Sequence, residues 1–225
     1  MLHTVTRIRG AKVRATDGDA GHVEEFVFDD DTWTIRYLVV NTETWLNRQV
    51  LISPMSIERR WTVAELPMRL TKEQLRTSPT IESPEALSRH HEARLLEHYG
   101  HPLYWENTAL STAGPDQRRI KPGDDRLCGM REVTGFHIQA VDCEIGHVDD
   151  FIIDDNSWRI EYLLIDTSSW METKSILIPP AALRGVDWSN SRMRVALTQD
   201  AVRRSPFSDS TPAASGEDPL VEWVM

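Results

Sequence analysis

The sequence is poor in cysteine and has no long apolar run. Its 225 residues include only two cysteines, Cys128 and Cys143, which form neither a CxxC pair nor the framework of a disulfide-rich domain. No stretch approaches the roughly 18 consecutive apolar residues of a membrane-spanning helix, and the opening residues MLHTVTRIRG lack the apolar core of a signal peptide. We therefore expect a cytoplasmic protein without an integral membrane segment.

Basic residues are outnumbered by acidic ones. The chain has 25 Lys and Arg against 35 Asp and Glu, which gives a formal net charge of −10. Because nucleic-acid backbones and anionic lipid headgroups are bound by clustered Lys and Arg, a surface of this charge repels them. Nucleic acid is therefore not an expected partner. The length and the 40% hydrophobic content suffice for one large or two small domains.

One acid-rich phrase occurs twice in the chain. Residues 21–33 read GHVEEFVFDDDTW and residues 146–158 read GHVDDFIIDDNSW. When the chain is aligned with itself at an offset of 125 from Gly21 to Leu46, 12 of 26 positions are identical. The repeat indicates a duplication. Its copies span residues 3–79 and 128–206, with a linker at residues 80–127 and a tail at residues 207–225.

Each copy contains several short strand-like runs. They are HVEEFVF, TIRYLVVNT, QVLIS and LPMRL in the first copy, and HVDDFII, RIEYLLIDT, SILIP and MRVAL in the second. The acidic stretches DDDT and DDNS are typical of hairpin turns. A short helix that follows Thr71 or Thr198 closes each copy. The pattern predicts a mainly β protein of two tandem small β-barrels, related by a pseudo-twofold axis and joined by a helical linker.

The linker carries the signals of one longer helix. In SPEALSRHHEARLLEHYG, Ser83 is a candidate N-cap, Pro84 suits the first helical position, and Gly100 suits the residue after the C-cap. These signals predict a helix over residues 84–99. The tail has a disordered composition up to its last residues, LVEWVM, which read either as part of that disorder or as a short docking peptide.

The second strand of each copy is apolar on both faces. Ile35, Tyr37 and Val39 alternate with Leu38 and Val40, and the second copy repeats this arrangement over residues 160–165. Because a barrel buries only its interior, the outward residues must meet a helix, the other copy or another chain. We predict an interaction surface that includes Leu38, Val40, Leu163, Ile165, Trp45, Trp170 and Trp223.

Six of the eight tryptophans form matched pairs across the repeat. The pairs are Trp33 with Trp158, Trp45 with Trp170, and Trp61 with Trp188. Recurrence at fixed places in a β repeat favours packing inside or between barrels over a ligand cage.

Histidine and acidic side chains offer an alternative, chemical interpretation of the repeated phrase. His22 precedes Glu24 and His147 precedes Asp149, a spacing that puts both side chains on one strand face for proton transfer. No matched nucleophile with a third orienting group accompanies them in either copy. We therefore predict no catalytic residue, and treat these histidines as structural.

Two metal sites were tested against ligand spacing. For calcium, residue twelve counted from Asp29 is Val40 and no glycine intervenes, which does not match the loop D-x-D-x-D-G with a final Glu. For zinc, His91 and His98 lie two helical turns apart, too far to share one ion, and His98 and His101 straddle the expected helix end. We predict no metal and no cofactor.

The phrase GHVEEFVFDDDTWTIRYLVVNT followed by WLNRQVLISP resembles the PRC-barrel domain, and residues 132–170 of the second copy resemble it even more closely. This family is named for the cytoplasmic domain of the photosynthetic reaction-centre H subunit, and also occurs in a ribosome maturation factor. The resemblance implies a small β-barrel that binds or assembles other molecules, with no family-wide catalytic residues.

The leading prediction is a non-catalytic protein-interaction or assembly module with an unidentified protein partner or a second copy of this chain. One alternative is a metal-dependent or His/acid-based enzyme or sensor at His22 and His147. The other alternative, by analogy with the H subunit, is a peripheral factor in the assembly of photosynthetic or membrane complexes.

Overall fold

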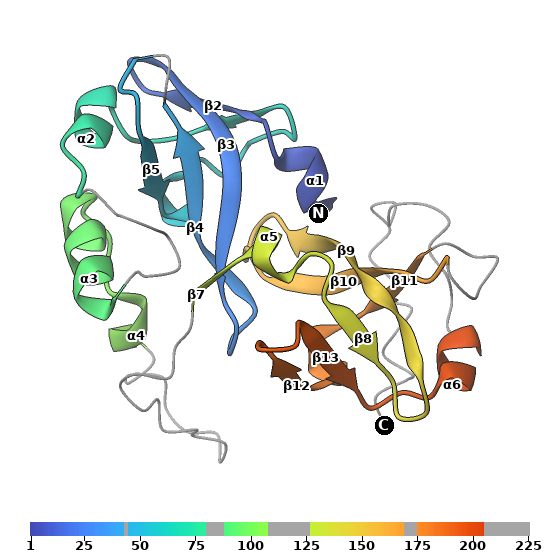
Figure 1. Ribbon diagram of the computed structural model, residues 1–225. Coiled ribbons are helices and arrows are strands. Elements are labelled where there is room, and N and C mark those ends of the chain that lie inside the picture. The colour runs from blue at the N-terminus through green and yellow to red at the C-terminus, as the bar shows by residue number, and fades with distance from the viewer. Residues whose placement is uncertain (43–44, 80–87, 108–126, 169–174, 205–225) are drawn as a thin grey trace. The chain divides into compact units, whose positions relative to one another are not determined.

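A computed structural model describes residues 1–42, 45–79, 88–107, 127–168 and 175–204 (Figure 1). The chain forms two compact units. The N unit comprises residues 9–129, and the C unit comprises residues 130–225 together with the first eight residues. Among the described residues, no helix combines the length and the apolar character needed to cross a membrane.

The N unit contains a mixed sheet of six strands in the order β5-β4-β3-β2-β6, with β7 paired to β3. β2 and β6 run parallel, and the other neighbours run antiparallel. The strands are β2 (Lys12–Ala15), β3 (Gly18–Asp29), β4 (Thr34–Asn41), β5 (Gln49–Ile52), β6 (Glu65–Pro67) and β7 (Leu127–Gly129).

The C unit contains a second mixed sheet, of seven strands, in the order β11-β10-β9-β8-β13-β12, with β1 paired to β9. Only β8 and β13 run parallel. The strands are β1 (Leu2–Thr4), β8 (His137–Gln139), β9 (Glu144–Asp154), β10 (Ile160–Asp166), β11 (Ser175–Ile178), β12 (Leu183–Asp187) and β13 (Arg192–Val195). The prediction of a mainly β protein is therefore confirmed.

The prediction of closed barrels is wrong for the described strands. The hydrogen-bonded order ends at β5 and β6 in one sheet and at β11 and β12 in the other. A proline stands just beyond β5 and β11, where the 3-10 turns Pro54–Ser56 and Pro180–Ala182 begin. Because proline has no N–H to give to a ladder, each strand stops there. Across the open side of the N unit, Ile57 and Met68 make only an isolated bridge.

The predicted hairpin turns are confirmed in both copies. The Asp29 carboxylate accepts hydrogen bonds from the backbone N–H groups of Asp31 and Thr32, which is the local bonding that makes aspartate a turn residue. Asp154 does the same for the turn before β10. Trp33 and Trp158 close the two turns with φ angles of 51° and 58°, so these paired tryptophans occupy a fixed turn position.

The predicted closing helices are also present. They are α2 (Lys72–Arg76) and α6 (Gln199–Arg204). Thr71 accepts from Gln74 N and the Gln74 side chain returns a bond to the Thr71 N–H, which completes a capping box. The equivalent Thr198 hydroxyl accepts from the Ala201 N–H. The remaining short helices are α1 (Val5–Ile8), α4 (Tyr104–Asn107) and α5 (Met130–Val133).

The described part of the linker contains the helix α3, which spans Arg89–His98. The Ser88 hydroxyl caps this helix by accepting from the His91 N–H. The predicted start at Pro84 falls in residues 80–87, which lie outside the described part of the chain.

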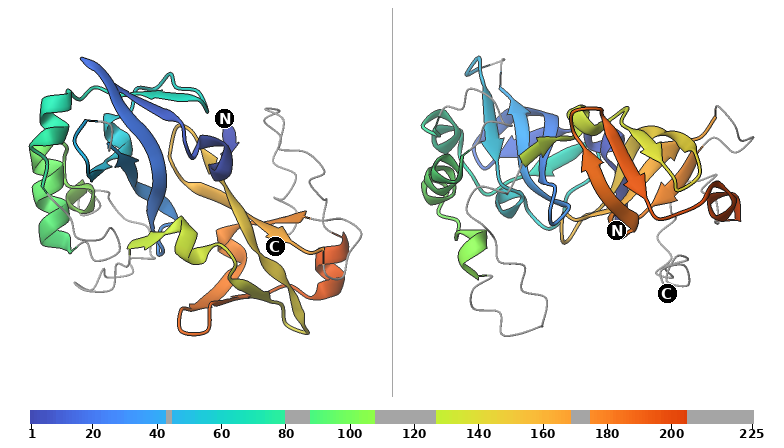
Figure 2. Two further views of the ribbon diagram at one scale, coloured as in Figure 1. Left: turned by 45° about the horizontal axis from the view of Figure 1, so that its top comes forward. Right: turned by 60° about the horizontal axis from the view of Figure 1, so that its bottom comes forward.

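The end of α3 is confirmed. Gly100, with φ of +70°, donates its N–H to the Glu97 carbonyl, and His101 donates to the Leu96 carbonyl. This pair of bonds is the Schellman motif, in which glycine takes the left-handed position without steric cost. Helices α2, α3 and α4 lie along one side of the N unit's sheet (Figures 1 and 2).

Candidate interaction sites

The strand residues predicted to form an interaction surface are inside the protein. Leu38, Val40, Leu163 and Ile165 each have 0% of their surface exposed. Leu38 lies between Phe26 and Ile52 in the sheet register, and so belongs to the core of the N unit. None of the four offers free surface. Their role in an interaction stays a prediction.

The predicted tryptophan contacts fall into two groups. Trp45 lies half-buried within the N unit, where its indole N–H donates to the Ala20 carbonyl at 3.1 Å and the Lys72 ammonium lies 4.4 Å from its ring centroid. These contacts are packing contacts. Trp170 and Trp223 lie outside the described residues.

The histidines of the repeated phrase do not join an acid in a catalytic arrangement. His22 is exposed, and a β-bulge between Val23 and Glu25 shifts the strand register at Glu24. The Glu24 carboxylate accepts from the Gln49 amide at 2.9 Å. In the C unit the exposed His147 has Nε2 4.0 Å from an Asp166 oxygen, a rim contact rather than a buried pair.

Within the described ranges, no group of three or more His, Cys, Asp and Glu side chains could hold a metal ion. The linker histidines considered for zinc bond to the N unit instead. His98 Nε2 lies 2.7 Å from the Gln74 carbonyl oxygen, and His101 Nε2 lies 2.6 Å from Ser56 Oγ. Burial lowers the pKa of His101, and Arg69 lowers it further, which favours the neutral ring in this contact.

A buried polar cluster fixes α3 and α4 to the outer face of β4. Glu92 on α3 is 2% exposed, and one of its carboxylate oxygens accepts from the Tyr37 hydroxyl at 2.9 Å and from the Tyr104 hydroxyl at 2.8 Å. The Arg36 guanidinium lies 3.9 Å from the centroid of the Tyr104 ring. Burial beside Glu92 raises the pKa of Tyr37, so this phenol stays a donor. In the N unit, therefore, α3 and α4 contact β4 at Arg36 and Tyr37.

The structure also contains a site that sequence analysis missed. β1 belongs to the first copy of the repeat but pairs with β9 of the second, with Leu2 opposite Asp154, His3 opposite Ile153 and Thr4 opposite Ile152. We call the edge of β9 that receives these residues the β9 slot.

The same exchange occurs in the other direction. β7 stands at the start of the second copy but pairs with β3 of the first copy (Figure 1). Cys128 lies opposite Phe28 in the register. Adding the repeat offset of 125 to His3 and Phe28 gives Cys128 and Ile153, so the two pairings are equivalent in register. In each sheet, therefore, one strand comes from the other copy of the repeat: β1 in the C unit and β7 in the N unit.

Residues 1–8 are held in the β9 slot by contacts of α1 as well as by the pairing of β1. Val5 and Ile8 of α1 are 1% and 0% exposed, whereas Thr6 and Arg7 between them are exposed. The Thr6 N–H donates to both oxygens of the buried Asp150 carboxylate at 3.2 and 3.3 Å. Because burial of apolar side chains and an internal bond for a helix N–H both favour docking, residues 1–8 are an integral part of the C unit.

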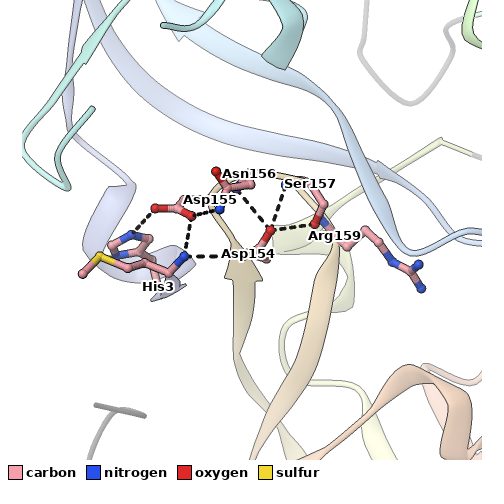
Figure 3. A network of polar contacts seen from close by, with 7 residues as sticks. His3, Asp154, Asp155, Asn156, Ser157 and Arg159 are labelled. Atoms are coloured by element: carbon pink, nitrogen blue, oxygen red, sulfur yellow. Dashed lines mark hydrogen bonds and ion pairs between the residues drawn. The ribbon is translucent and has the colours of Figure 1, made fainter. Parts of the chain in front are cut away.

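A polar network lies at the tip of the slot (Figure 3). The Met1 ammonium contacts the carboxylates of Asp154 and Asp155, and His3 Nε2 lies 3.5 Å from Asp155. The Asp155 N–H donates to the Met1 carbonyl at 2.9 Å. The acidic turn of the second copy thus binds the donated strand through its carboxylates and through the Asp155 N–H. The sequence DDNS gave no indication of this contact.

Asp150 gives the slot a dependence on pH. Burial raises its pKa above the ordinary value of 3.8, although bonds from the Phe151 and Thr6 N–H groups act in the opposite direction. A raised pKa in the folded state means that the folded chain binds more protons, so its free energy of unfolding falls as pH rises from 3.8 through the raised value.

We therefore expect Asp150→Asn to remove this fall, because an amide oxygen still accepts from Thr6 and Phe151 but does not ionise. Urea unfolding between pH 4 and neutrality measures the free energy of unfolding of both proteins. As pH rises, this free energy falls for the wild-type chain relative to the variant. Asp150→Ala is the control: it does not ionise either, but it leaves both donors unpaired, so it is about 1–3 kcal/mol less stable than Asp150→Asn at every pH. A constant difference between wild type and Asp150→Asn across the range would contradict the assignment.

The comparisons with known proteins identify one domain. Residues 2–60 match the family model of the PRC-barrel domain, and no curated protein matches the chain. The match begins in β1, so the family pattern includes the strand that this chain places on β9. It also covers the repeated phrase at residues 21–33.

Proposed function

Because residues 2–60 form a PRC-barrel domain, we propose that the chain is a non-catalytic interaction or assembly module of the cytoplasm, whose partner is a protein. The single observation that supports this role most is the reciprocal exchange of β1 and β7. Both sheets leave strand edges that bind a segment distant in sequence, and strand addition is a common mode of protein recognition.

The side-chain chemistry supports the same role. Among the described residues, the exposed histidines of the repeated phrase are not paired with a nucleophile. The buried carboxylates of Glu92 and Asp150 accept hydrogen bonds within the fold. The acidic balance of the chain, 35 acidic against 25 basic residues, favours a protein partner over a nucleic acid.

The test uses the purified full chain. Proteins captured from an extract are identified, made separately and titrated into the chain in a calorimeter. We expect direct binding with a Kd near micromolar, about −8 kcal/mol, and a fixed stoichiometry. His22→Ala and His147→Ala are the controls, and both leave binding unchanged. Stoichiometric metal in the purified chain, together with loss of a metal-dependent activity in these variants, would overturn the proposal in favour of a chemical function.

A further inference from the structure

Two segments of the chain carry the same slot-binding pattern. Residues 2–8 read LHTVTRI and residues 127–133 read LCGMREV, with apolar residues at the first, fourth and seventh positions. Five of these six apolar side chains are buried, and the sixth, Leu2, is half-buried. A glycine with positive φ follows two residues later in both, at Gly10 (83°) and Gly135 (88°). The chain therefore contains two strands with the same apolar pattern, β1 and β7, and two equivalent strand edges that bind them, on β9 and β3.

Because of the exchange, the donated strand and the slot that binds it are far apart in the sequence. Thr6 and Asp150, which are hydrogen-bonded in the C unit, lie 144 residues apart in sequence. The chain passes from the C unit to the N unit in one peptide bond, between Ile8 and Arg9. A slot filled by residues 1–8 makes the same contacts whichever molecule supplies them, because only the path of the backbone at that junction differs.

We propose that the β9 slot is a self-association site that binds residues 1–8 of a second copy of this chain. This inference rests on the proposed function and gives it a partner. Two molecules exchange their first eight residues, and each keeps its remaining contacts. Within one molecule the chain keeps the donated strand near its slot, at a fixed effective concentration that we take as on the order of millimolar. A second copy therefore replaces the chain's own strand as the protein concentration during folding approaches that value.

The experiment places one cysteine on each side of the slot, in different molecules. One variant carries Thr4→Cys and the other carries Ile152→Cys, and both carry Cys128→Ala and Cys143→Ala. Thr4 and Ile152 are directly opposite in the register, and opposite residues of antiparallel strands are close enough for a disulfide. The two variants are unfolded, mixed, refolded together at roughly 0.01 to 1 mM and oxidised. We expect a covalent dimer that contains one of each variant and rises at least tenfold in yield over this range.

The control pairs Thr4→Cys with Arg184→Cys, whose cysteine stands at an exposed position of β12 away from the register partners of β1. It yields no more dimer than random collision does. A second measurement needs no cysteine: light scattering of the wild-type chain after refolding at high concentration shows a dimer, and the Arg7→Ala variant, which changes only an exposed side chain, keeps it.

Absence of mixed disulfide at every concentration, with a wild-type chain that stays monomeric, overturns the inference. That outcome leaves the proposed function intact wherever a different protein binds the full chain in the calorimeter. The two ideas therefore fail separately.

Discussion

Replacing Val5 and Ile8 with alanine lowers the free energy of unfolding of the C unit by about 5 kcal/mol, although both residues belong to the first copy of the repeat. Both side chains are almost completely buried against β9 and its neighbours in the C unit. Large-to-small substitutions at buried Val and Ile cost about 2–3 kcal/mol each, from lost transfer energy and from the cavity that remains. The sum is a large fraction of the roughly 5–15 kcal/mol that stabilises a typical domain.

Hydrogen exchange of the full-length chain, followed by mass spectrometry in increasing urea, measures the effect separately in each unit. Amides of β9 and β10 lose protection in the variant, while amides of β4 and β5 in the N unit change little. Arg7→Ala is the matched control, since it truncates an exposed side chain of the same short helix and leaves Thr6, which bonds to Asp150 through its side chain as well as its N–H, in place. Equal loss of protection in both units would contradict the assignment of residues 1–8 to the C unit.

Gly146→Ala and Gly21→Ala each destabilise their own sheet by about 3 kcal/mol. These glycines open the repeated GHV phrase and have φ angles of 143° and 126°, which other residues rarely adopt. A Cβ added at Gly146 would lie 2.0 Å from the Asp166 carbonyl oxygen, and one at Gly21 would lie 2.0 Å from the Asn41 carbonyl oxygen. The substitution therefore strains the backbone and also pushes the neighbouring strand away.

Gly185→Ala is the control, because its added Cβ meets no atom within 4 Å and its backbone conformation is not one that requires glycine. We expect its stability to change by less than about 0.5 kcal/mol. Urea unfolding of the three variants compares them directly. If alanine at Gly146 costs no more than alanine at Gly185, the glycine of the repeated phrase is not held by the close approach of β10. The expected result would explain the repeated phrase mainly by the backbone geometry of its glycine, since its histidine is exposed on the rim.

Local features of the fold were predictable from the sequence. Alternating apolar residues located β3, β4, β9 and β10, and Asp29 and Asp154 marked the hairpin turns between them. Thr71 and Gly100 correctly predicted a helix start and a helix end. Each of these signals acts over a few residues, because caps and turns form hydrogen bonds with their own neighbours in the chain.

The buried acid of the slot could not be predicted in the same way. Asp150 reads as one of several exposed acids in GHVDDFIID; alternation puts it on the face of Val148, but its residue type gives no reason to expect burial. A register shift in β9, where Leu164 faces Asp150 and Ile165 faces Val148, removes Asp149 from the ladder. At this bulge the alternation breaks, so Asp150 and the adjacent Phe151 are both buried, with 8% and 1% of their surface exposed. The equivalent shift at Glu24 also separated the histidine and acid of the first copy.

The sequence by itself determined the duplication, the strand and turn pattern and the PRC-barrel domain at residues 2–60, because each is recorded in neighbouring residues. Only the tertiary structure decided that the sheets stay open and that β1 and β7 each complete the sheet of the other copy. β1 and β7 are three residues long, too short to show a period, and their partners lie far away along the chain. Such pairing depends on which edge is available after folding, and the candidate interaction site of this protein lies at that edge.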